Sequence, residues 1–245
     1  MRPSPEISVV ILCYKAGNFA PLFVDQVKKV LEENRLDYEM ILVANFNKKE
    51  EFSDPTPAIV RNLAASNPRL TVVAKAKEGM MGWDMRTGLE AAQGETIAVI
   101  DGDGQMPPKN IYAVYQALKS ENADMALTYR TTRQDGWVRL LVSRMYNLSL
   151  KLLFPKVKIK DANSKPKIFT RKALQQLELT STDWFIDAEI AIQASDRNFK
   201  IAEVPMVFLH NPTRASFINT AAIVTFALNL LKYRLKKWVD LREKS

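Results

Sequence analysis

The sequence has few of the residues that build several common kinds of functional site. It contains one cysteine, Cys13, and one histidine, His210, among its 245 residues. A single cysteine cannot form a disulfide framework, and this usage is typical of a reducing compartment. A single histidine excludes a histidine metal cluster, and we do not expect a Ser-His-Asp triad.

Long apolar runs are also missing. No uncharged apolar stretch reaches the roughly 20 residues that a membrane-spanning helix needs. Residues 1–6 lack the apolar core of a secretory signal. We therefore expect a cytoplasmic protein, with the inner face of the membrane as the alternative site.

Acidic residues are fewer than basic ones, and the formal net charge is +8. This excess favours an anionic partner, such as nucleotide phosphates, acidic lipid headgroups or nucleic acid. We do not expect nucleic acid, because the aromatic residues are not interleaved with the basic clusters as stacking platforms would be.

Short apolar runs rich in β-branched residues alternate with amphipathic segments along the first hundred residues. This alternation predicts βαβ units, hence an α/β fold with a mostly parallel central sheet. The expected strands are 7–12, 38–44, 70–74 and 96–100, and the expected helices are 21–34, 57–66 and 83–92. Further along we expect helices at 110–120, 137–154 and 184–196, and strands at 124–128, 167–169 and 201–205. Pro205 indicates that the last strand ends there or lies near an edge.

The polar segment after the strand 96–100 is the strongest candidate site. It reads Asp-Gly-Asp-Gly-Gln-Met-Pro-Pro, so Asp101 and Asp103 follow a buried strand directly and point the same way in a strand-like register. Open α/β sheets bind ligands at this end of their strands. Two carboxylates and the carbonyl of Gln105 suit Mg²⁺ or Mn²⁺, while an Asp-Gly turn without function is the alternative.

Five ordered motifs resemble the inverting family 2 glycosyltransferases, which have the GT-A fold, a Rossmann-like three-layer architecture. The most similar branch makes polyprenyl-phosphate sugars, as dolichyl-phosphate mannose synthases do. The motifs are the Asp-x-Asp-x-Gln-x-Pro-Pro segment at 101–108, the glycine-containing helix at 79–94, the Asp-x-x-Ser segment at 161–171, Phe-x-Asp-x-Glu at 185–189 and Glu-Val-Pro at 203–205.

This resemblance implies transfer of a hexose from a nucleotide sugar, of the GDP-mannose or UDP-glucose type, to a polyprenyl phosphate. Asp101, Asp103 and Gln105 would hold the divalent metal on the donor diphosphate. Arg130, Arg139 and Ser143 would grip the acceptor phosphate, with the last two on one face of a helix. The implied donor contacts are Tyr14, Asn45, Gly79, Asp101, Asp103 and Arg214, and the implied catalytic residues are Asp103, Arg130, Arg139 and Asp187.

Two alternatives stay open beside this resemblance, and the second of them rests on a departure from the family pattern. The second strand of the family usually ends in an acid that reads the nucleoside base, whereas this chain has Asn45. The first alternative is transfer to a sugar or protein hydroxyl, for which Asp187 would act as the base. The second is a degenerate GT-A module that binds a nucleotide sugar without catalysis.

The C-terminal segment differs in character from the rest of the chain. We expect a catalytic domain over residues 1–215 and an amphipathic basic helix over 216–245. Apolar residues followed by lysine, arginine, tyrosine and tryptophan in 217–238 are typical of a helix that lies in the headgroup layer of a membrane. A helix packed on the core, with its basic end in water, is the alternative.

Overall fold

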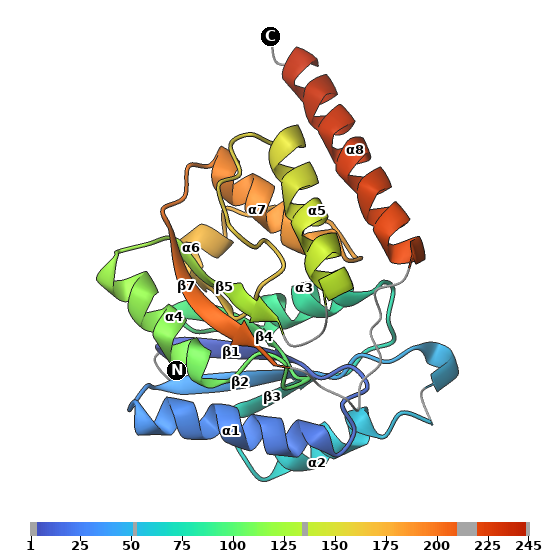
Figure 1. The fold of residues 1–245 in the computed structure, drawn as a ribbon. Coiled ribbons are helices and arrows are strands. Elements are labelled where there is room, and N and C mark those ends of the chain that lie inside the picture. Colours follow the sequence, from blue (N-terminus) through green and yellow to red (C-terminus); the bar gives the residue numbers. More distant parts are fainter. Residues whose placement is uncertain (1–3, 51–52, 134–136, 210–219, 244–245) are drawn as a thin grey trace.

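The computed structural model describes residues 4–50, 53–133, 137–209 and 220–243 (Figure 1). Within these ranges a seven-stranded sheet forms the middle layer, in the order β3-β2-β1-β4-β6-β5-β7. Its strands are β1 (Ile7–Leu12), β2 (Tyr38–Val43), β3 (Leu70–Val73), β4 (Thr96–Asp101), β5 (Met125–Arg133), β6 (Lys167–Thr170) and β7 (Ile201–Phe208).

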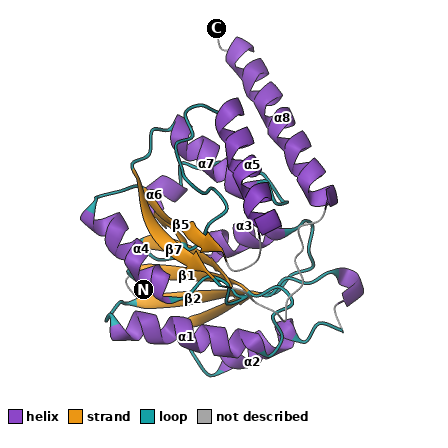
Figure 2. Cartoon of the chain, viewed as in Figure 1, coloured by secondary structure: helices purple, strands orange, loops and turns teal. Residues whose placement is uncertain are grey.

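Helices cover both faces of this sheet (Figure 2). They are α1 (Phe19–Glu33), α2 (Thr56–Ala65), α3 (Met81–Ala91), α4 (Lys109–Ser120), α5 (Trp137–Leu153), the short α6 (Arg171–Leu174), α7 (Ile186–Asp196) and α8 (Thr220–Glu243). A 3₁₀ turn, η1 (Lys48–Glu50), follows β2. Three layers therefore enclose two hydrophobic cores, one on each side of the sheet.

The alternation of side chains along each strand divides the residues between these cores. In β1, Val9 and Ile11 pack with α1, α2 and α4, while Val10 and Leu12 pack with α3 and the helices beyond it. All six residues of β1 are buried, as expected for a central strand covered on both faces. The predicted α/β class and the mostly parallel sheet are confirmed.

The second half of the sheet differs from the expected layout in two ways. Strand β6 runs antiparallel to both β4 and β5, so the sheet is not uniformly parallel. Strands β5 and β7 pair beyond their expected ends, and β7 continues past Pro205 to Phe208. Pro205 is tolerated because β7 is the last strand of the sheet, which confirms the edge and corrects the predicted end.

Helix α8 packs against the domain through part of its surface. The ring of Phe226 stacks on Tyr146 of α5 at a centroid distance of 3.9 Å, and Leu230 is buried in the same core. Leu228, Leu231 and Leu235 are exposed. The expected domain boundary at 215/216 lies outside the described residues and stays a prediction. No described helix combines the length and the apolarity that crossing a bilayer requires.

Candidate functional site

The carboxyl ends of the parallel strands meet at one edge of the sheet. Strands β1, β2 and β4 end there together, in the pairing of Leu12 with both Val43 and Asp101. Because β6 runs in the opposite direction, it begins at this edge, with Lys167 paired to Val99 of β4. The chain segment that leads into β6 therefore lies beside the end of β4.

The Asp101–Gln105 segment follows the expected strand directly and is held at the surface of this edge. Asp101 is the last residue of β4, and its side chain is 22% exposed. The backbone N–H of Gln105 donates to Asp103 Oδ1 at 3.0 Å, and the backbone N–H of Leu209 donates to the carbonyl of Gln105 at 2.9 Å. Gly104 has a φ of +74° and lies against Phe19, where a Cβ atom would be 2.8 Å from the ring.

These oxygen donors fit a divalent cation only if other ligands complete its shell. Among the described residues, no group of three acidic, histidine or cysteine side chains could hold a metal. Mg²⁺ commonly takes one or two protein carboxylates together with waters and substrate phosphates. Asp101, Asp103 and Gln105 can provide that protein share, with the remaining positions left to a diphosphate.

Two buried lysines lie behind Asp101. The ammonium of Lys165 donates to Asp101 Oδ2 at 3.4 Å and to Asp187 Oδ2 at 3.2 Å. Lys167 donates to Asp187 Oδ1. The side chains of both lysines and of Asp187 are at most 2% exposed. The cluster therefore links the candidate metal segment to the interior of the fold.

The charges in this cluster set the proton affinities of its members. Burial alone would raise the pKa of Asp187, but Lys165 and Lys167 hold it below its ordinary value. Burial lowers the pKa of Lys167 to about 8. Burial would also lower the pKa of Lys165, but the two carboxylates raise it above its ordinary value. Asp187 is thus a stable anion with a lysine on each oxygen.

Asn45, expected to contact the donor base, is completely buried. Its Nδ2 donates to Asp84 Oδ1 and to Thr87 Oγ1, both at 3.0 Å, and its Oδ1 accepts from the backbone N–H of Lys75 at 2.9 Å. Asp84 also forms an ion pair with Lys77. The amide is therefore bonded to the protein, where it holds Asp84 and the loop after β3. Its expected contact with the donor base stays a prediction.

Tyr14 contacts Lys77, the lysine that pairs with Asp84. Its ring is 3.9 Å from the ammonium of Lys77, and its hydroxyl accepts from Asn47 Nδ2 at 2.9 Å. The ends of β1, β2 and β3 thus bring Tyr14, Asn45 and Lys77 together. Lys77 and Asp84 were not among the residues expected here, since a lysine–aspartate pair seven residues apart carries no signal of contact.

Gly79 lies close to Thr182 in the loop before α7. A Cβ atom at Gly79 would be 2.6 Å from Thr182 Cβ, and the backbone N–H of Met80 donates to the Thr182 carbonyl at 2.7 Å. This close approach accounts for the glycine by packing alone. Its expected contact with the donor stays a prediction.

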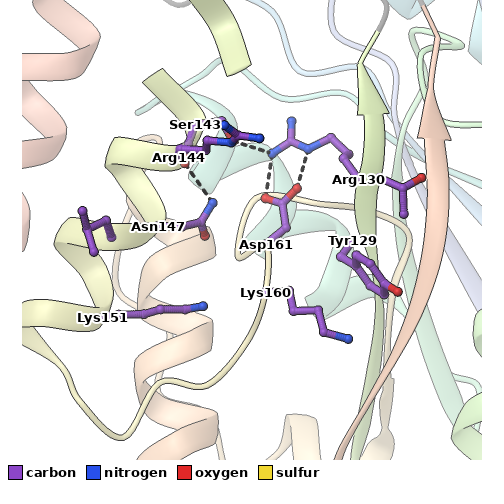
Figure 3. A pocket seen from close by; sticks show the side chains of 10 residues that line it. Tyr129, Arg130, Ser143, Arg144, Asn147, Lys151, Lys160 and Asp161 are labelled. Atoms are coloured by element: carbon purple, nitrogen blue, oxygen red, sulfur yellow. Dashed lines mark hydrogen bonds and ion pairs between the residues drawn. The ribbon is translucent and has the colours of Figure 1, made fainter. Parts of the chain in front are cut away.

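A basic pocket of about 340 Å³ opens between β5 and α5 (Figure 3). Four of its residues are cationic and one is acidic, which gives the lining a net charge of +3. Figure 3 shows Arg130 reaching from β5 toward Asp161, with the side chains of α5 on the opposite wall. The lining residues are Tyr129, Arg130, Thr131, Ser143, Arg144, Asn147, Leu148, Lys151, Lys160 and Asp161.

Arg130 is fixed in this pocket by Asp161. Its Nε and Nη2 donate to the two carboxylate oxygens at 2.5 and 2.7 Å, and Nη2 also lies 3.4 Å from Ser143 Oγ. Burial alone would raise the pKa of Asp161, but the Arg130 guanidinium holds it below its ordinary value. Asn147 joins the walls, because its Oδ1 accepts from the backbone N–H of Ala162 at 3.1 Å. The structure thus brings Arg130 and Ser143 together, as expected.

Two expected residues lie outside the description. The backbone of Arg139 belongs to α5, but its side chain is not described, and Arg214 falls in the undescribed range 210–219. The structure adds Arg144, Lys151 and Lys160 to the pocket. The spacing of seven between Arg144 and Lys151 places them on one face of α5, a pattern that is readable in the sequence.

Three comparisons with known proteins agree with this geometry. The family model described as glycosyl transferase family 2 matches residues 8–178. The chain is 26% identical over 240 residues to a dolichol-phosphate mannosyltransferase from Pyrococcus furiosus. This alignment covers 95% of the present chain and 64% of the relative. The chain is also 26% identical over 152 residues to an undecaprenyl-phosphate 4-deoxy-4-formamido-L-arabinose transferase from Serratia proteamaculans, covering 61% of this chain and 44% of that one. The chain thus spans less than two thirds of these relatives.

Solved structures show the same architecture. Glucosyl-3-phosphoglycerate synthase from Mycobacterium tuberculosis, in complex with UDP, matches with a TM-score of 0.72 and 19% identity over 94% of this chain and 80% of that one. Mannosyl-3-phosphoglycerate synthase from Rubrobacter xylanophilus matches with a TM-score of 0.73 and 14% identity, over 95% and 75% of the two chains. The expected GT-A fold is confirmed. The family model matches residues 8–178, which is more than half of the sequence. The chain therefore belongs to glycosyl transferase family 2.

Proposed function

We propose that this glycosyltransferase moves a hexose, with inversion, from a nucleotide sugar to a polyprenyl phosphate. The observation that carries the proposal is the basic pocket between β5 and α5, whose β5 residues lie at the same edge of the sheet as Asp101. The names of the similar transferases, which refer to dolichol and undecaprenyl phosphates, support this class of acceptor. The donor is of the GDP-mannose or UDP-glucose type.

A phosphate acceptor makes specific demands on the site. It is already anionic at neutral pH, so it needs no base to attack the anomeric carbon. It needs positioning, and it needs cations that offset its repulsion from the donor diphosphate. The pocket supplies both. Ser143, Arg144 and Lys151 lie on the helix wall, and Asp161 orients the Arg130 guanidinium on the opposite wall.

A hydroxyl acceptor would instead require a general base, and Asp187 is poorly suited to that task. Its side chain is 2% exposed, and each of its oxygens accepts from a lysine. Its pKa lies below the ordinary value, so it holds protons weakly. This arrangement supports the phosphate acceptor and gives Asp187 the role of a buried counter-ion.

A divalent ion would bind at the donor end of the site. The segment from Asp101 to Gln105 would hold Mg²⁺ or Mn²⁺, which stabilises the departing nucleoside diphosphate when bound. Solved structures of the similar glucosyl-3-phosphoglycerate synthase contain UDP with Mn²⁺ or with Mg²⁺. The residues of this segment would orient the diphosphate at the end of β4, on the side of the basic pocket.

Peripheral contact with the membrane would bring the lipid acceptor to this pocket. One side of α5 lines the pocket, and Leu141, Met145, Leu148 and Leu152 form a stripe that is between 51% and 72% exposed. Helix α8 adds three more exposed leucines, at 228, 231 and 235. Apolar stripes next to basic side chains suit a helix that lies in the headgroup layer.

The proposal is tested by following labelled sugar from GDP-mannose and UDP-glucose to a short polyprenyl phosphate, with Mn²⁺ or Mg²⁺. We expect a metal-dependent product that partitions into chloroform and is lost in the Asp103→Asn variant. Donor binding without a lipid product would favour a hydroxyl acceptor or a module that binds the donor without catalysis. No donor binding at all would show that the chain has lost the donor chemistry of its family.

A further inference from the structure

Lys165 takes no part in the proposed transfer, yet three acceptors hold its side chain in place. Its side chain is 2% exposed. The ammonium has three N–H donors, and three acceptors surround it: Asp101 Oδ2 at 3.4 Å, Asp187 Oδ2 at 3.2 Å and Met81 Sδ at 3.6 Å. The side chain therefore has one defined orientation, toward the end of β4.

The backbone of Lys165 is equally fixed. The hydroxyl of Thr128, a buried residue of β5, donates to the Lys165 carbonyl at 2.7 Å. The backbone N–H of Thr128 donates to the Pro166 carbonyl at 3.2 Å. Anchored in this way between β4 and β5, the ammonium cannot move away from Asp101 without leaving its other partners.

Charge balance explains why Asp101 is needed as a partner. In the ion pairs of the described residues, the buried ammonium groups of Lys165 and Lys167 share one buried carboxylate, that of Asp187. An ammonium buried without a matching anion is strongly unfavourable. Asp101 supplies the second negative charge, and it is the one member of the cluster with a substantially exposed side chain.

We propose that Lys165 is a positioning residue that provides the donor site with a built-in cation. It orients Asp101 and competes with the divalent ion for that carboxylate, so that the ion is held on the protein by Asp103 and Gln105. A metal on Asp101 would lie close to a like charge, which disfavours it. The inference rests on the proposed metal-assisted binding of the donor and assigns Asp101 to lysine rather than to metal.

The test measures binding of Mn²⁺ alone to the full chain, by electron paramagnetic resonance, without donor or lipid. We expect Lys165→Met to bind Mn²⁺ about tenfold more tightly than the native chain, because the competing charge is gone. Lys167→Met is the matched control: it removes an equally buried ammonium that contacts Asp187 but not Asp101. The Mn²⁺ affinity of Lys167→Met should stay within about twofold of native, because Lys167 is separated from Asp101 by Asp187 and its charge acts more weakly there.

A second pair of variants keeps the test decisive if Lys165→Met does not fold, which circular dichroism reports. In the native background, Asp101→Asn should change Mn²⁺ affinity by no more than about twofold, whereas Asp103→Asn should abolish binding. Where Lys165→Met does fold, adding Asp101→Asn to it should cancel the gain in Mn²⁺ affinity.

Equal losses in Asp101→Asn and Asp103→Asn would overturn the inference, as would Lys165→Met binding Mn²⁺ no more tightly than native. Because neither donor nor lipid is present, the result is independent of whether a lipid product forms.

Discussion

Asn45, which the family resemblance places at the donor base, is buried and hydrogen-bonded to the protein. Its amide donates to Asp84 and Thr87 and accepts from the backbone of Lys75. An aspartate there would direct an oxygen toward Asp84, whose pKa is already raised by burial. The asparagine is therefore matched to the acid on α3, and the two positions are understood as a pair.

We predict that Asn45→Asp lowers the free energy of unfolding by about 1–3 kcal/mol, the cost of replacing a buried hydrogen bond with an unmatched polar contact. The exchanged variant Asn45→Asp/Asp84→Asn should recover part of that loss, because one amide and one carboxylate again face each other. Urea unfolding at pH 7 measures both. If Asn45→Asp is as stable as native, the proposed pairing is wrong.

The sequence indicates the residues of this site by type, but their pairings come from the tertiary fold. Asp101 ends β4 where the pattern predicts it, and Asp103 follows in the next turn. Arg130 lies within β5, which is longer than expected, and Ser143 lies within α5. Lys165 and Lys167 could not be predicted as buried, because lysine is almost always exposed unless a partner is present. Their partner Asp187 is 20 or more residues away in sequence.

At the scale of elements, α5 has two surfaces with different tasks. One lines the basic pocket through Ser143, Arg144 and Asn147, and another exposes Leu141, Met145 and Leu152. The helix thus joins the place where a phosphate would bind to a surface that favours lipid.

We predict that Met145→Glu/Leu152→Glu reduces the fraction of protein that floats with phosphatidylglycerol vesicles by several-fold, since it places carboxylates against anionic headgroups. Leu22→Glu is the control for an added carboxylate elsewhere on the surface, because Leu22 is 62% exposed on α1. Equal flotation of all three proteins would contradict a role for α5 in membrane contact.

Strand β6 marks the limit of pattern-based prediction at this scale. The periodicity predicts a strand at 167–169, and β6 is found at Lys167–Thr170. Its direction is not encoded locally, because four residues fit either orientation and pairing with β4 and β5 decides. That antiparallel direction is what carries Lys165 to the carboxyl edge of the parallel strands.

At the scale of the whole molecule, the ion pair between Arg130 and Asp161 connects the stability of the fold with the basic pocket. Both side chains are about nine-tenths buried, and the pair joins β5 to the loop before β6. The pKa of Asp161 lies below its ordinary value, so the folded state binds fewer protons at this group than the unfolded chain does. Its contribution is complete above about pH 4 and is lost as pH falls through the lowered pKa.

We predict that Asp161→Asn lowers the free energy of unfolding by about 3–5 kcal/mol at pH 7, because Arg130 is left buried without its anion. The difference from native should shrink as the pH falls from 4 to 3. Asp25→Asn, which breaks an exposed pair with Lys29, should change stability little. Urea unfolding across this range is the measurement, and a difference that does not depend on pH would contradict the assignment.

The most direct test of phosphate recognition compares two acceptors of equal chain length, a polyprenyl phosphate and the corresponding polyprenol. The native chain should transfer sugar to the phosphate and not to the alcohol. Arg144→Gln, in the pocket, should lower kcat/KM for the phosphate about tenfold, the loss of one charge-assisted contact. Lys172→Gln, exposed on α6, should leave it unchanged. Transfer to the polyprenol at a similar rate, or no effect of Arg144→Gln, would contradict the account.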